Sequence, residues 1–242
     1  MVVRLLRIVA LVALAVAVTT AASPKRLLVV TVTKGFRHDS IPTAERVIAR
    51  LGATSGSFTV DFARTDEELL ARTTAKALEA YDGVLFAHTT GDLPLADRAA
   101  FLKWIEAGHG FVGIHSASDT FHGFTPYVQM VGGEFDSHGE QATVRVLVED
   151  ASHPATRGLD RSFTTHDEIY LFKNFERSRV RMLLALDRHP NTSEAGYFPL
   201  AWHREHGRGR VIYTALGHRE DVLESEWFGR HLLGAIRWAV RE

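Results

Sequence analysis

The sequence predicts an α/β fold built on one sheet, mostly parallel, with helices packed on both faces. Up to residue 120, short apolar runs alternate with segments of helical periodicity, which is the pattern of right-handed βαβ units. After residue 140, strand-like runs follow one another with few helices between them, which predicts antiparallel strands added to the same sheet. No linker separates the two halves, so we expect residues 23–242 to form a single domain.

The first half is expected to contain four strands and three helices. The first strand is apolar throughout, as in a strand buried on both faces, and Ser40 and Pro42 mark the start of the first helix. Pro94 opens the third helix and Gly108 ends it. The expected strands are 26–32, 57–63, 82–87 and 110–114, and the expected helices are 41–51, 73–80 and 94–107.

The second half is expected to consist mainly of strands and to close with one amphipathic helix. Residues 206–209, His-Gly-Arg-Gly, have the composition of a hairpin loop joining the last two strands. The expected strands are 142–149, 166–172, 180–187, 199–205 and 210–216, and the expected helix is 225–240.

The first 22 residues have the pattern of a secretory signal peptide. Arg4 and Arg7 precede the apolar run 8–18, and small residues at 19–22 supply a cleavage site. This run of 11 residues is too short to span a bilayer, so we expect cleavage and a secreted or periplasmic protein without a membrane span. An uncleaved apolar helix is the alternative.

Composition excludes several classes of function. The 28 basic and 29 acidic residues give a net charge of -1, so no global field favours nucleic acid as a partner. The absence of cysteine excludes disulfides, thiolate metal ligands and a cysteine nucleophile. Thirteen histidines point instead to acid/base or metal chemistry.

Three histidines follow predicted strands of the parallel sheet. His38, His88 and His115 come after the first, third and fourth strands. In a flavodoxin-like strand order these three strands are neighbours, and their carboxyl ends open into one crevice. If the order holds, the three imidazoles share a site; otherwise they are ordinary loop histidines.

The segment Gly113-Ile114-His115-Ser116-Ala117 resembles a nucleophile elbow that presents histidine instead of a nucleophile. Ser116 and Ser118 are alternative nucleophiles, but neither lies in a Gly-x-Ser-x-Gly motif. We expect Ser118 to cap the following helix.

Residues 166–171 alternate with a period of two. His166, Glu168 and Tyr170 are therefore expected on one face of a strand, and Ile169 and Leu171 on the other. The first face is interpreted as an acid/base and sugar-binding surface. The alternative is an ordinary solvent-exposed strand face.

Two further histidines, His138 and His218, follow glycine-containing turns. They have no compact metal motif such as His-Glu-x-x-His, so a divalent metal bound by histidines is a possible cofactor whose ligands the sequence does not assign.

Taken in order, these motifs resemble those of the ThuA-like (trehalose utilisation) family. The resemblance implies a class I glutamine amidotransferase-like fold, a flavodoxin-like three-layer sandwich. Amidotransferases of this fold carry cysteine where His115 stands, so glutamine hydrolysis is not expected. The family is associated with bacterial disaccharide use, in particular with 3-keto sugars. The matching segments are 35–38, 89–92, 113–120, 132–138, 167–170, 199–202 and 213–218.

We therefore expect an exported carbohydrate-processing enzyme that acts on a keto-sugar or glycoside by proton transfer beside a carbonyl. In this hypothesis Glu168 or His115 removes the proton. His38 or His218, with or without a bound metal, polarises the carbonyl oxygen. The alternatives are a non-catalytic sugar-binding module and a metal-dependent hydrolase.

A second set of residues is expected to bind and orient the small carbohydrate. The aromatic members would stack on the sugar ring, and the charged and polar members would donate or accept hydrogen bonds. The set comprises Arg37, His88, Asp119, His138, Tyr170 and Trp202.

Overall fold

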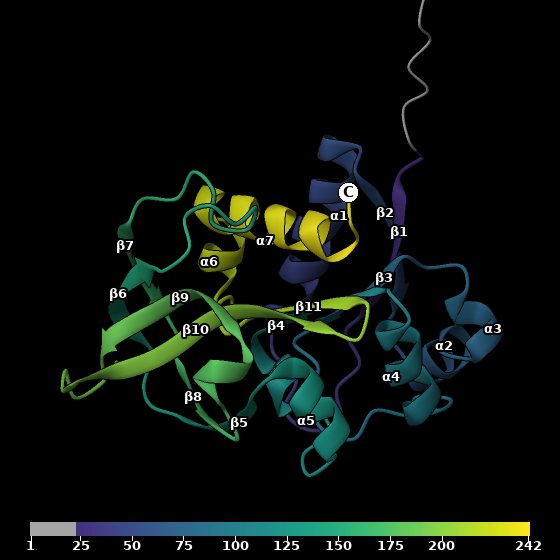
Figure 1. Ribbon diagram of the computed structural model, residues 1–242, viewed down its shortest axis with the longest axis horizontal. Helices are drawn as coiled ribbons and strands as arrows, with labels where there is room; N and C mark the ends of the chain where they lie inside the picture. Colours follow the sequence, from purple (N-terminus) through teal and green to yellow (C-terminus); the bar gives the residue numbers. More distant parts are fainter. Residues whose placement is uncertain (1–22) are drawn as a thin grey trace, which may run out of the picture.

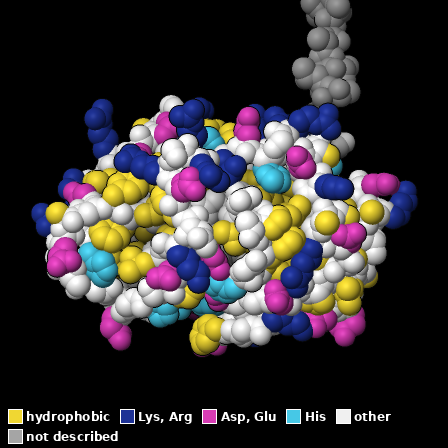
Figure 2. Space-filling model, turned by 60° about the horizontal axis from the view of Figure 1, so that its bottom comes forward, with side chains coloured by type: hydrophobic (Ala, Val, Ile, Leu, Met, Phe, Trp, Pro, Cys, Tyr) yellow, Lys and Arg dark blue, Asp and Glu magenta, His cyan; other side chains and the backbone are white. Residues whose placement is uncertain are grey.

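The computed structural model describes residues 23–242, so the predicted signal segment lies outside the described residues. Among residues 23–242, no helix combines the length and the apolar character needed to cross a membrane. Acidic and basic side chains are interspersed over the face drawn in Figure 2, in keeping with the near-zero net charge.

A nine-stranded mixed sheet forms the centre of the molecule, in the order β2-β1-β3-β4-β11-β10-β9-β6-β7 (Figure 1). The first five strands run parallel: β2 (Phe58–Ala63), β1 (Lys25–Val30), β3 (Gly83–Ala87), β4 (Gly110–Ile114) and β11 (Gly209–Thr214). The others pair antiparallel: β10 (Ala195–His206), β9 (Arg181–Arg188), β6 (Ala142–Val148) and β7 (Ser162–Asp167). The predicted fold class is confirmed, and β1, β3 and β4 are neighbours as the flavodoxin-like order requires.

Helices cover both faces of this sheet and complete three layers (Figure 1). Leu27 and Val29 of β1 face one core, and Leu28 and Val30 face the other, because consecutive side chains of a strand point to opposite faces. The first core is closed by α1 (Ile41–Ser55), α6 (Glu220–Glu224) and α7 (Glu226–Ala239). The second core is closed by α2 (Asp66–Arg72), α3 (Ala75–Leu78), α4 (Arg98–Glu106) and α5 (Thr125–Val131).

The helix predicted at 73–80 is shorter in the structure, where it is α3, and the preceding helix α2 was not predicted. The prediction missed a capping signal: the Thr65 side chain accepts a hydrogen bond from the Glu68 amide at 3.2 Å, and this cap begins α2. Thr74 caps α3 in the same way, through the Ala77 amide at 3.2 Å.

The helix predicted at 94–107 begins later, at α4. The Asp97 carboxylate accepts a hydrogen bond from the Ala100 amide at 2.9 Å and fixes the start of the helix. Pro94 therefore belongs to the preceding loop and not to the first turn.

The single strand predicted at 166–172 is wrong. β7 ends at Asp167, and the chain then leaves the central sheet to form β8 (Tyr170–Lys173), which pairs with β5 (Glu134–His138) in a separate two-stranded sheet. The alternation of facing is lost at this transfer: His166 is exposed, whereas Glu168 and Tyr170 are both buried. Glu168 therefore lies in a connection between sheets, where its backbone is free of strand pairing.

Candidate metal centre

Three histidines and one glutamate converge at the carboxyl ends of the parallel strands. We call His38, His115, Glu168 and His218 the histidine–glutamate cluster; one ligand atom from each lies within 4.8 Å of every other. The four residues follow β1, β4, β7 and β11 and are distant in sequence. Only the strand order brings them together, at the edge where open α/β sheets bind ligands.

His115 is held in an unusual backbone conformation at the end of β4. Its φ of 51° lies in the left-handed region, and its carbonyl accepts a hydrogen bond from the Tyr213 hydroxyl at 2.6 Å. Its Nδ1 lies 2.8 Å from the carbonyl oxygen of Ala215. Because a carbonyl can only accept, Nδ1 carries a proton, and Nε2 is the ring nitrogen that faces the cluster.

Glu168 is the centre of the cluster. Its Oε2 lies 3.3 Å from His115 Nε2 and 3.3 Å from His218 Nδ1. Burial alone would raise the pKa of the Glu168 carboxyl, but its contacts with His115 and His218 outweigh burial and hold the pKa well below its usual range. The cluster therefore contains a carboxylate at neutral pH.

His38 contributes a neutral imidazole. Burial, followed by the neighbouring His115 and His218, lowers the pKa of His38 to about 3. The uncharged ring is the form that binds metals, since coordination requires a free nitrogen lone pair.

The spacings among three of the four donors, those of His115, Glu168 and His218, fit a divalent transition metal ion such as Zn²⁺. Ligand atoms about 2.0–2.1 Å from zinc, at the corners of a tetrahedron, lie roughly 3.3 Å apart. His115 Nε2 and His218 Nδ1 are 3.2 Å apart, and each is 3.3 Å from Glu168 Oε2. Imidazole nitrogens and a carboxylate oxygen are also the donor types that such ions prefer.

The turn that carries His218 is fixed from two sides. The Asp167 carboxylate accepts hydrogen bonds from the Gly217 amide at 2.7 Å and the Arg219 amide at 3.1 Å. The Gly217 carbonyl accepts a bond from His88 Nε2 at 2.8 Å. Gly217 has a φ of 102°, a conformation that a side chain would strain. His88 is fully buried, and its bond to Gly217 places it behind the turn that carries His218.

A cavity of about 540 Å³ opens beside the cluster. His38 and His218 line it together with Gln141 and Arg219. Phe36 also lines the cavity and is 66% exposed, which is unusual for a large apolar side chain. The cluster is therefore accessible to a small molecule through a polar cavity that has one aromatic wall.

Two of the predicted carbohydrate-binding residues adjoin the cluster. The Tyr170 ring is buried and lies 4.2 Å from the His115 ring, centroid to centroid. His138 places its Nδ1 3.3 Å from Glu168 Oε1 and is 43% exposed.

Three other predicted residues are not brought into the cluster. Arg37 turns back to donate a hydrogen bond to the Thr31 carbonyl at 3.2 Å. Asp119 is bonded to His122. Trp202 is fully buried, with Nε1 donating to the Val131 carbonyl at 2.7 Å, so its ring offers no surface for stacking on a sugar.

The two serines of the elbow are both buried. Residues 115–119 form a 3-10 helix, so Ser118 does not cap an α-helix as predicted. Its hydroxyl lies 2.8 Å from that of Tyr213 and 3.5 Å from the His115 carbonyl, which makes it part of the support beneath the elbow. Within the described residues, Ser116 Oγ has no hydrogen-bond partner.

Sequence reasoning missed Phe36 and Asp167 as candidate site residues. Both lie inside motifs that had been singled out, next to His38 and Glu168, but neither has a distinguishing local pattern. Phe36 stands out only through its exposure, and Asp167 only through its bonds to a turn 50 residues away.

Comparison with solved structures shows the same fold in bacterial proteins. A ThuA-like protein from Bacteroides uniformis is 22% identical, with a TM-score of 0.74 over 93% of this chain and 95% of that chain. A ThuA-like protein from Parabacteroides merdae is 20% identical, with a TM-score of 0.74 over 90% of each chain. A cytoplasmic protein from Salmonella typhimurium LT2 is 13% identical, with a TM-score of 0.61 over 88% of this chain and 99% of that one. At these identities the likeness concerns the fold alone.

Among curated proteins, none matches this chain. The family model for ThuA, described as trehalose utilisation, matches residues 26–239 and therefore nearly the whole described chain. The protein belongs to the ThuA (trehalose utilisation) family.

Proposed function

We propose that the protein is a metal-dependent enzyme that acts on a small carbohydrate, a keto-sugar or a glycoside. The observation that supports this most directly is the histidine–glutamate cluster, whose four donors meet beside an open polar cavity. A divalent ion held by these four residues would supply Lewis-acid polarisation to an adjacent substrate oxygen. Membership of a trehalose-utilisation family supports carbohydrate as the substrate class.

His138 is the best placed group for proton transfer. Its Nδ1 lies 2.9 Å from the Gly139 carbonyl and 3.3 Å from Glu168 Oε1, and both neighbours are acceptors. Nδ1 therefore carries the proton and Nε2 is free to accept one from a substrate carbon or hydroxyl. His115, one of the two residues expected in this role together with Glu168, is fully buried and is better suited to be a ligand.

Phe36 is the candidate surface for the sugar ring. The apolar face of a pyranose packs well on an aromatic ring, and Phe36 is exposed in the cavity that also reaches His38 and His218. Gln141 and Arg219, on the same cavity, are suited to bonding the hydroxyl groups.

The decisive experiment measures metal content and turnover together. Purified protein is assayed for bound transition metal and for activity on trehalose, its 3-keto form and related glycosides, before and after treatment with a chelator. We expect about one metal ion per chain, with activity lost on chelation and restored by the metal. His115→Ala should lose both, whereas His166→Ala, which changes an exposed histidine of β7, should keep both.

Two results would point elsewhere. Thermal stabilisation by a sugar without any product would support the alternative of a non-catalytic sugar-binding module. Full activity of metal-free protein would contradict the proposal.

We also propose that the protein is exported, because residues 1–22 have the composition of a signal peptide. The test is N-terminal sequencing of protein recovered from the native cell envelope or medium. Cleavage near Ala22 is expected; recovery of the intact chain from the cytoplasm would contradict export.

A further inference from the structure

A second polar cavity, distinct from the one beside the cluster, is lined by four arginines. Its volume is about 550 Å³, and Glu205 is the one carboxylate among its lining residues. Four arginines beside one carboxylate give this cavity an excess of positive charge, whereas the 28 basic and 29 acidic residues of the whole chain nearly balance. The four arginines are Arg179, Arg181, Arg204 and Arg210.

This cavity lies at the opposite end of the sheet from the histidine–glutamate cluster. Arg210 stands near the start of β11, and Ala215, whose carbonyl bonds His115, follows the end of the same strand. Five residues at about 3.3 Å per residue separate the two by roughly 16 Å. A ligand at the arginines would therefore leave the cluster untouched.

Most of these arginines lack a neutralising carboxylate. Arg179 pairs with Glu176 at 2.7 Å, but within residues 23–242 no ion pair involves Arg181, Arg204 or Arg210. Among the described residues, Arg204 donates to backbone carbonyls alone, those of Gln129 at 2.5 Å and Glu205 at 3.4 Å.

Burial makes the charged form of these arginines less favourable. The pKa of Arg204 is lowered by its burial and by the adjacent Arg179. Arg210 donates to the Trp238 carbonyl at 3.0 Å, but its buried Nε has no acceptor among the described residues. Donors of this kind are stabilised by an incoming anion.

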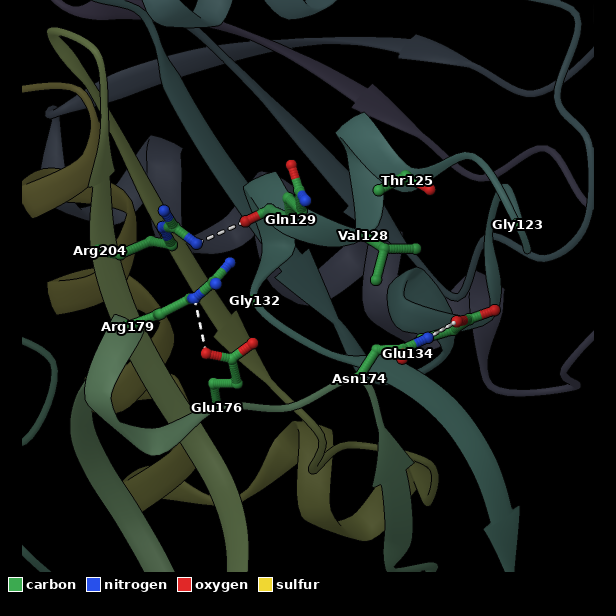
Figure 3. A pocket seen from close by; sticks show the side chains of 10 residues that line it. All are labelled: Gly123, Thr125, Val128, Gln129, Gly132, Glu134, Asn174, Glu176, Arg179 and Arg204. Carbon is green, nitrogen blue, oxygen red and sulfur yellow. Dashed lines mark hydrogen bonds and ion pairs between the residues drawn. The ribbon is translucent and has the colours of Figure 1, made fainter.

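Two other cavities share lining residues with this one. Arg179 and Arg204 also line a cavity of about 220 Å³, where Figure 3 shows both side chains on one wall, facing the α5 residues Val128 and Gln129. Arg210 and Trp238 also line a third cavity of about 480 Å³. We call these three neighbouring cavities, which share arginine side chains in their walls, the arginine track.

Trp238 adds an aromatic ring to the track. It lines both the cavity of about 550 Å³ and the cavity of about 480 Å³. The Arg210 guanidinium lies 5.1 Å from the centre of the Trp238 ring. Alternation of arginine and aromatic surface suits a ligand that has both acidic groups and ring faces.

We propose that the arginine track binds an acidic polysaccharide, a chain of sugars bearing about one carboxylate each. Arginine binds carboxylates through two parallel hydrogen bonds, and Trp238 offers a surface to a sugar ring. The acidic side chains interspersed at Glu176 and Glu205 match a ligand of moderate charge density. They would repel nucleic acid, which carries one charge per about 1.7 Å.

The test compares binding of polygalacturonate with that of dextran, an uncharged glucose polymer of similar length, by calorimetry at low and high salt. We expect the full chain to bind polygalacturonate at least tenfold more tightly than dextran, with affinity falling as salt rises. The double variant Arg181→Ala/Arg204→Gln should lose at least tenfold in affinity for polygalacturonate. Arg50→Ala, which removes an exposed arginine of α1 outside the track, should change affinity less than twofold.

Turnover and folding are measured for each variant. Activity on a small neutral substrate should be unchanged, because the track is separate from the cluster. If the double variant fails to fold, Arg181→Ala alone serves, since this side chain is exposed and makes no ion pair within residues 23–242; it should weaken polygalacturonate binding about threefold or more. Equal binding of dextran, unchanged affinity of the variants, or tighter binding of single-stranded DNA or polyphosphate would each overturn the proposal.

Discussion

Two groups of buried histidines lie in this molecule, and they differ in what surrounds them. In the histidine–glutamate cluster, ring nitrogens converge on a carboxylate. In the second group, the His153 and His203 rings stack on each other with centroids 4.4 Å apart, and the Trp238 ring lies at an angle beside both. His231 Nδ1 donates to the Ala155 carbonyl at 2.8 Å. Within the described chain, only the first group has donors that could together hold a metal ion.

Burial has the same electrostatic effect in both groups. It lowers the pKa of His38 to about 3, and it lowers the pKa values of His153 and His231 to about 4 each. A lowered histidine pKa is therefore no sign of function in this fold. The distinguishing feature is Glu168, whose carboxylate oxygen completes a set of potential metal donors with the nearby imidazole nitrogens.

The largest expected effect comes from removing that feature. Glu168→Gln keeps the size of the side chain but removes its charge, so we expect the metal to be lost and kcat/KM to fall about 1,000-fold, equal to about 4 kcal/mol. Metal analysis and steady-state kinetics measure both. Glu134→Gln, which changes a buried carboxylate beside His122, is the matched control. If Glu168→Gln kept its metal and its activity, Glu168 would not be the feature that distinguishes the histidine–glutamate cluster from the second group of histidines.

The second group is expected to govern the acid stability of the fold. The pKa of His231 is about 6.5 in the unfolded chain and about 4 in the folded one. Below pH 6.5 the unfolded chain binds a proton that the folded chain does not, so stability falls as the pH drops from about 6.5 to about 4. The loss from this residue is about 3 kcal/mol.

Urea unfolding at a series of pH values measures this dependence. His231→Asn keeps a donor for the Ala155 carbonyl but does not titrate, so its stability should fall less steeply over the same range. Equal slopes for the variant and the original chain would show that His231 is not responsible.

A smaller effect is expected from the support of the cluster. Asp167→Asn leaves one acceptor for two amides, those of Gly217 and Arg219, and so loosens the turn that presents His218. Metal affinity should fall about 10- to 100-fold, as for other residues that orient metal ligands. A competition titration with a chelator measures this, with Asp187→Asn on the exposed end of β9 as the control. Unchanged affinity would mean that the turn holds its shape without the carboxylate.

The smallest effect is expected at His203. Its Nδ1 is buried without a partner among residues 23–242, and its ring stacks on His153. His203→Phe keeps the stacked ring and removes an unpaired polar atom, so the free energy of unfolding should change by less than about 1 kcal/mol. Denaturant unfolding and metal analysis provide the check. Loss of metal in this variant would show that the second group also supports the metal centre.

Much of the architecture could be predicted from the sequence because its signals are local. The apolar strand 26–32, the glycine-flanked strand 110–114 and the hairpin loop 206–209 reflect burial and turn chemistry that act over a few residues. The errors were local too. The Thr65 and Asp97 caps were overlooked, and the change of sheet after Asp167 leaves no mark in the alternation of residues 166–171.

The sequence by itself determined the α/β class, the family and which histidines follow the central strands. Only the tertiary structure decided which of these side chains meet. His38, His115 and His218 converge on Glu168, while His88 supports a turn and Trp202 fills the core. The physical reason is the sequence distance over which the interactions act. Strand and helix formation depend mainly on residues that are close in sequence. The convergence of the ligands depends on strand order and on hydrogen bonds between residues about 50 to 130 positions apart.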